Sequence, residues 1–183
     1  MNFFETPYNA IKEKAFILGE SSRQEYHTAG MASVPERLVR CIWHDQLLDK
    51  TRIRTSDGRQ AIIYSQGEWN FGPGPDFIDA LFKIDGEESI RGDVELHVRA
   101  ADWRRHGHHQ NPEYCGVLLH VALWNDGKEQ FVTNARGETI PQIILADCLS
   151  DDLASLAGRI DMENYPLSCQ HFVNFRGMGK IDK

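Results

Sequence analysis

Cysteine is scarce in this chain of 183 residues, and its spacing is not that of a metal or disulfide motif. The four cysteines stand far apart, without a Cys-x-x-Cys pair; they are Cys41, Cys115, Cys148 and Cys169. This pattern argues against a zinc ribbon and against a disulfide-stapled domain. We therefore expect free, mostly buried thiols and a reducing compartment.

Long hydrophobic runs are also missing. The apolar run at residues 15–18 is too short for the core of a secretory signal, and Lys12, Glu13 and Lys14 precede it. No stretch approaches the roughly 20 apolar residues that a membrane-spanning helix needs. The sequence thus predicts a cytoplasmic protein with no membrane partner.

An excess of basic charge is absent as well. The chain has 20 Lys and Arg against 27 Asp and Glu, a net charge of −7. Indiscriminate binding to duplex DNA comes from clustered cations that neutralise phosphates, so this balance disfavours it, although it permits a local basic groove. The hydrophobic fraction of 41% is ordinary for a globular protein of one domain.

The chain is expected to have three parts. Residues 1–33 contain polar breakers without periodicity, which predicts a loosely ordered N-terminal extension. Residues 34–165 are predicted to form a single α+β domain, with a helix that starts near Ser33-Val34-Pro35-Glu36 and then a mostly antiparallel mixed sheet. Residues 166–183 are predicted to be a C-terminal tail.

The most informative segment is the alternating strand at residues 92–100. Successive side chains of a strand point to opposite faces, so the apolar residues share one face and the polar ones the other. The polar face carries Asp93, Glu95, His97 and Arg99. Acid, imidazole and guanidinium groups in a row suit a metal or phosphate site; the alternative is an outward face with weak ion pairs.

A second acidic position follows a loop rich in glycine and proline. Gly74-Pro75-Asp76 ends this loop where the next strand begins, and Asp79 follows within the strand. In an antiparallel pair one of these two carboxylates falls opposite Glu95 and His97. A divalent cation would offset the repulsion between such carboxylates, so Asp76 and Glu95 are the predicted metal ligands. Carboxylates favour Mg²⁺ or Mn²⁺, and a nearby histidine makes Zn²⁺ possible.

The order Pro-Asp, hairpin, Glu-x-basic residue resembles the layout of the PD-(D/E)XK nucleases. In that superfamily a helix precedes three meandering strands, and the metal-binding acids lie on the second and third. The resemblance implies a restriction-endonuclease-like core with Asp76, Glu95 and His97 as catalytic residues. This chain departs from the pattern because His97 stands where the superfamily has lysine.

Three histidines in four residues follow the strand. His106-Gly107-His108-His109 lies beside two arginines, which predicts a phosphate-facing segment. The predicted phosphate-binding residues are Arg99, Arg104, His106 and His108. Two alternatives stay open, a zinc site through His106 and His108 or a solvated connection between strands.

Two further residues are candidates for a supporting role. His120 interrupts an apolar strand at residues 117–124, where a buried histidine is more often a hydrogen-bonded core group than a ligand. It can also orient a ligand, as can Asp102 at the end of the alternating strand.

Four motifs together are similar to those of an uncharacterised bacterial family, a domain of unknown function. They are Gly-Pro-Gly-Pro-Asp-Phe, Gly-Asp-Val-Glu-Leu-His, Asp-Trp-x-x-His-Gly-His and Leu-His-Val, between residues 72 and 121. The resemblance spans residues 34–170 and implies a cytoplasmic bacterial protein. Members of that family are longer than this chain, which implies that the C-terminal tail is shortened.

Our first hypothesis for function is a metal-dependent phosphodiesterase that hydrolyses nucleic acid. The alternative is a non-catalytic module whose polar strand face and histidines bind a protein, a nucleic acid or a structural zinc. A third hypothesis is an inactive remnant of the nuclease fold. The clustered acids, histidines and arginines favour the first, and the negative net charge favours the other two.

Overall fold

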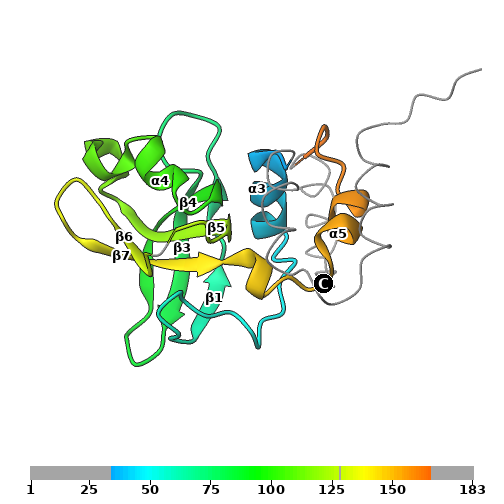
Figure 1. Ribbon diagram of the computed structural model, residues 1–183, viewed down its shortest axis with the longest axis horizontal. Helices are drawn as coiled ribbons and strands as arrows, with labels where there is room; N and C mark the ends of the chain where they lie inside the picture. Colours follow the sequence, from blue (N-terminus) through cyan, green and yellow to red (C-terminus); the bar gives the residue numbers. More distant parts are fainter. Residues whose placement is uncertain (1–33, 128, 166–183) are drawn as a thin grey trace, which may run out of the picture.

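The computed structural model describes residues 34–127 and 129–165 (Figure 1). The predicted N-terminal extension, the predicted tail and Cys169 lie outside the described residues. Within them the architecture is α+β, as predicted, with few helices and one mixed sheet. No helix of the described part is long and apolar enough to cross a membrane.

The sheet has seven strands in the order β1-β3-β4-β5-β7-β6, and β2 pairs with β3. Their bounds are β1 Ala61–Ser65, β2 Glu68–Trp69, β3 Phe77–Ile84, β4 Ile90–Arg99, β5 Val117–Trp124, β6 Phe131–Thr133 and β7 Thr139–Ile144. The alternating segment is β4, and the apolar run is β5, a central strand buried on both faces. Both strands were predictable because their side-chain patterns are those of half-buried and fully buried strands.

The first half of the sheet is an antiparallel meander, and its centre is parallel. β1, β3 and β4 pair antiparallel with one another in sequence order, whereas β4 pairs parallel with β5 and β5 parallel with β7. A parallel neighbour requires a crossover, which here contains α4 Asp102–Arg105 and the 3₁₀ turns η2 His108–Gln110 and η3 Pro112–Tyr114. The β6–β7 hairpin turns at Gly137, where φ is positive.

Two helices close the opposite side of the sheet from this crossover (Figure 1). They are α3 Glu36–His44, whose N-cap is Pro35, and α5 Leu153–Arg159. Ile42 and Trp43 of α3 and Leu156 of α5 belong to one buried cluster that includes Val94 and Leu96 of β4. The apolar face of β4 therefore packs against the helices. The 3₁₀ turn η4 Leu145–Asp147 follows β7 and leads toward α5.

The polar face of β4 is covered rather than exposed to solvent. Trp103 of α4 is fully buried with Val117, Val132 and Ile140, and its indole N–H donates to the Thr133 carbonyl at 3.0 Å. This anchor holds the crossover against the sheet. Glu95 and His97 of β4 consequently lie between two layers of protein.

Candidate metal centre

Glu95 and His97 project from the same face of β4 and are both buried, with exposed fractions of 5% and 0%. They share that face because they are two residues apart on one strand. The parallel register places Glu95 beside His120 of β5. A carboxylate and two imidazoles thus meet in the interior, where a polar group without a partner costs stability.

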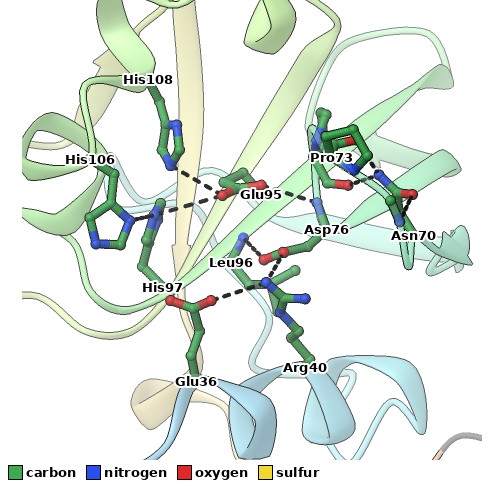
Figure 2. A network of polar contacts seen from close by, with 12 residues as sticks. Glu36, Arg40, Asn70, Pro73, Asp76, Glu95, Leu96, His97, His106 and His108 are labelled. Atoms are coloured by element: carbon green, nitrogen blue, oxygen red, sulfur yellow. Dashed lines mark hydrogen bonds and ion pairs between the residues drawn. The ribbon is translucent and has the colours of Figure 1, made fainter.

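Asp76, and not Asp79, is the acid beside Glu95. Its backbone N–H donates to Oε2 of Glu95 at 3.0 Å, and its own Oδ2 accepts the N–H of Leu96 at 3.0 Å (Figure 2). Pairing of Phe77 with Val94 sets this register. Asp79 lies on the exposed side of β3, where it pairs with Arg91 at 2.6 Å.

Arg40 of α3, at the bottom of the view in Figure 2, extends its guanidinium group to the buried Asp76. Arg40 forms an ion pair with Oδ1 of Asp76 and a second with Glu36, 3.1 Å away. Both oxygens of Asp76 therefore already have protein partners. Arg40 was not predicted from the sequence; its only signal there is the spacing of Glu36 and Arg40, one helical turn apart.

Burial dominates the electrostatics of this acidic pair. Removal from water raises the pKa of Asp76 and of Glu95 well above the usual carboxyl range, and the neighbouring carboxylate raises that of Asp76 further. Arg40 acts in the opposite direction on both. A second positive charge near Glu95 would balance the negative charge of the two buried carboxylates.

Three imidazoles gather on the other side of Glu95. Nε2 of His97 lies 3.2 Å from Nδ1 of His106, and Oε1 of Glu95 lies 3.2 Å from Nε2 of His108 and 3.8 Å from Nε2 of His97 (Figure 2). One ligand atom from each histidine falls within 4.8 Å of the others, so this triad can hold a metal ion. His97 comes from β4, whereas His106 and His108 come from the crossover.

The ring nitrogens of His108 are buried without a hydrogen-bond partner among the described residues. The residue as a whole is 7% exposed. Its ring lies against Tyr114 in a tilted arrangement with centroids 3.8 Å apart, and burial lowers its pKa, which favours the neutral ring that a metal needs. An imidazole held neutral, buried and aimed at a carboxylate is consistent with a ligand.

The donor spacing agrees with a small coordination sphere. Metal–nitrogen bonds of about 2.1 Å in a tetrahedron separate neighbouring donors by about 3.4 Å. The His97–His106, Glu95–His108 and Glu95–His97 separations of 3.2, 3.2 and 3.8 Å lie close to this value. Imidazole and carboxylate donors suit Zn²⁺, Mn²⁺ or Fe²⁺ better than Mg²⁺.

Two buried residues continue the polar row behind His97. Its Nδ1 lies 3.0 Å from Nε2 of His120, and Nδ1 of His120 lies 2.9 Å from Oε1 of Gln142 on β7. His120 is thus a partnered core histidine that contacts a candidate ligand. The sequence analysis missed Gln142, whose signal is a polar residue in the middle of an apolar strand.

The other predicted residues lie around the centre and make different contacts. Asp102 accepts the backbone N–H of Arg99 at 3.2 Å and pairs with Arg105 at 2.8 Å. Arg104 pairs with Glu129 on the surface at 3.2 Å. The structure therefore brings together Asp76, Glu95, His97, His106, His108 and His120, but not Arg99, Arg104 or Asp102.

The comparisons with known proteins agree with the predicted resemblance to an uncharacterised domain family. No curated protein and no solved structure matches the chain. One family, described as protein of unknown function (DUF2851), matches residues 36–176. This range contains all the acids and histidines of the candidate metal centre. Because the match covers most of the chain, the protein belongs to the DUF2851 family.

Proposed function

We propose that this protein is a metal-dependent phosphodiesterase whose metal is held by His97, His106, His108 and Glu95. The observation that carries the proposal is the gathering of three histidine donor atoms within 4.8 Å of one another, with Glu95 3.2 Å from His108 and 3.8 Å from His97, beside a second buried carboxylate, Asp76. The sequence hypothesis placed the metal between Asp76 and Glu95. The proposal moves it toward the histidines, because both Asp76 oxygens already have partners.

The order of the elements supports a nuclease-like core. A helix, an antiparallel meander of β1, β3 and β4, a crossover and the parallel strand β5 follow one another as in the PD-(D/E)XK layout. Asp76 precedes the second meander strand and Glu95 lies on the third. His97 occupies the position of the basic residue. These correspondences favour phosphodiesters, and nucleic acid in particular, as the substrate class.

The residues of the centre have separate parts in the proposed reaction. A divalent metal there would supply a Lewis acid for the phosphate and would make its bound water a better nucleophile. Glu95 and the imidazoles fix its position, while Arg40 and Asp76 form an adjoining charged pair. His106 is exposed, so substrate can approach on its side, where the exposed Arg104 and Arg105 lie on α4.

A second candidate function is a structural zinc site. Four protein donors can close a tetrahedral sphere, whereas catalytic zinc keeps one position open. The three histidines can hold an ion together, Glu95 beside His108 is a candidate fourth donor, and the set joins the crossover to β4. A structural zinc would therefore bind without any turnover. The two functions differ in whether the exposed His106 stays bound as a ligand or leaves one metal position open.

Metal binding and phosphodiester hydrolysis, measured together, test the proposal. We expect tight binding of Zn²⁺ or Mn²⁺ by the purified metal-free protein, and metal-dependent cleavage of bis-p-nitrophenyl phosphate and of single-stranded DNA. Glu95→Gln and His108→Gln should each weaken metal binding at least 10-fold and abolish cleavage, because each removes one donor. His109→Gln, in the same segment but outside the donor set, is the matched control.

The possible results separate the two candidate functions. Tight zinc binding that Glu95→Gln weakens, without cleavage of any phosphodiester, would identify the site as structural. Metal affinity that survives the Glu95→Gln/His108→Gln double substitution would rule out the proposed centre.

A further inference from the structure

We propose that His120 and Gln142 are positioning residues that hold His97 with its Nε2 lone pair directed into the metal centre. This inference rests on the proposed function, because it concerns the same centre. It assigns a role to two buried residues that touch neither the proposed metal nor a substrate. The hydrogen atoms along the row Gln142, His120, His97 fix the orientation of each side chain.

The orientation of the Gln142 amide is the first step. Its Nε2 donates to the Ser56 hydroxyl at 3.2 Å and to the backbone carbonyl of Glu129 at 3.5 Å. A carbonyl oxygen only accepts, so the NH₂ group must face Glu129. Oε1 of Gln142 is therefore the atom that faces His120.

The proton on His120 follows from that orientation. Its Nδ1 lies 2.9 Å from Oε1 of Gln142, and two acceptors cannot bond each other, so Nδ1 carries the hydrogen. The ring is fully buried, and an apolar interior disfavours a charged imidazole. His120 is consequently neutral, and its Nε2 is an acceptor.

The tautomer of His97 is then determined. Its Nδ1 lies 3.0 Å from the accepting Nε2 of His120 and must donate. With its hydrogen on Nδ1, the buried His97 ring presents a lone pair at Nε2. That nitrogen is the one that lies 3.2 Å from His106 and 3.8 Å from Glu95.

Strand pairing builds this row into the sheet. β5 pairs parallel with both of its neighbours, and His120 is in register with Glu95 of β4 and with Gln142 of β7. His97 stands two residues after Glu95 on the same face. Side chains of three adjacent strands thus form one continuous row, so the ligand nitrogen is oriented before a metal binds. Partners of this kind commonly change metal affinity 10- to 100-fold.

Two measurements on the full-length protein test the inference. Long-range ¹H–¹⁵N NMR of the metal-free protein should show His97 protonated at Nδ1 and unprotonated at Nε2. Zinc affinity, measured by competition with a chromophoric chelator, should fall about 10- to 100-fold in His120→Phe and in Gln142→Leu. His120→Gln offers an amide oxygen to Nδ1 of His97, so its affinity should stay within about 3-fold of wild type.

His120→Phe, Gln142→Leu and the conservative His120→Gln together distinguish a positioning role from a general loss of fold. Circular dichroism and thermal unfolding verify that each variant is folded, and Gln142→Leu tests the row without altering either histidine. Protonation of His97 at Nε2, or unchanged zinc affinity in both variants, would overturn the inference while leaving the proposed function intact. Absence of zinc binding by the wild-type protein would instead overturn the proposed function, and the positioning role with it.

Discussion

At the scale of single residues, burial and a counter-ion shift the pKa of Asp76 in opposite directions. Loss of water raises the pKa of this carboxyl group, and the nearby Arg40 guanidinium lowers it. Asp76 is 3% exposed, whereas Asp79, three residues later, pairs with Arg91 in solvent. The chain thus contains one buried and one exposed Arg–Asp pair within the same strand region.

Removal of the guanidinium should cost far more at the buried pair than at the exposed one. We expect Arg40→Leu to lower the free energy of unfolding by about 3 kcal/mol at about pH 9, because an uncompensated buried carboxylate remains. At about pH 5 the loss should be smaller, since Asp76 can then take up a proton. Urea unfolding at both pH values measures the difference.

Arg91→Leu is the matched control for this prediction. Both side chains of the Arg91–Asp79 pair are more than half exposed, so the loss should stay below about 1 kcal/mol at either pH. Equal losses in the two variants would mean that Asp76 does not depend on Arg40.

At the scale of elements, the loop before β3 is held by one side chain. Asn70 donates to the carbonyls of Pro73 and Pro75 at 3.0 and 2.8 Å and accepts the N–H of Gly72 at 2.8 Å (Figure 2). Gly74 has a φ of 96°, which a residue with a Cβ adopts only with strain. The loop therefore delivers Asp76 to Glu95 in a defined position.

Asn70→Ala should loosen this loop without touching the metal centre directly. We expect a loss of about 2 kcal/mol in unfolding free energy, because the loop loses three hydrogen bonds, of which the one to Pro75 is part-buried. Asn125→Ala is the control, since its side chain accepts a single exposed N–H, from Gly127 at 3.2 Å. A loss as small for Asn70 as for Asn125 would show that the glycines and prolines alone hold the loop.

At the scale of the whole molecule, the helices pack against one face of the sheet and the crossover covers the other. The polar centre lies between the sheet and the crossover. Both carboxyl groups of this centre have a pKa in the folded protein far above the unfolded values of 3.8 and 4.5. The folded state therefore retains protons that the unfolded chain releases as the pH rises. Under such linkage, stability falls with pH between the two values.

The metal-free protein should accordingly lose stability as the pH rises from about 4 to about 8, where the folded carboxyls finally ionise. Urea unfolding across this range measures the slope, and Asp76→Asn should make it shallower because one of the two groups no longer titrates. Binding of a cation releases the retained protons, so metal affinity should rise over the same range. A flat stability profile in the metal-free protein would contradict this prediction.

Part of the fold and part of the centre were predictable from the sequence. Strand periodicity located β4 and β5 and put Glu95 and His97 on one face. Periodicity does not specify register, so the choice between Asp76 and Asp79 was open until Phe77 was seen to pair with Val94. The parallel centre of the sheet was likewise not apparent from the strand patterns.

The α+β class, the identity of the polar residues on β4 and the family membership follow from the sequence alone. Those properties depend on local periodicity and on short motifs, which neighbouring residues carry. The fold was needed to show that His106 and His108 fold back onto His97, that Arg40 pairs with Asp76 and that Gln142 supports His120. These contacts join segments far apart in the chain, and the packing of the crossover and of α3 against the sheet sets them.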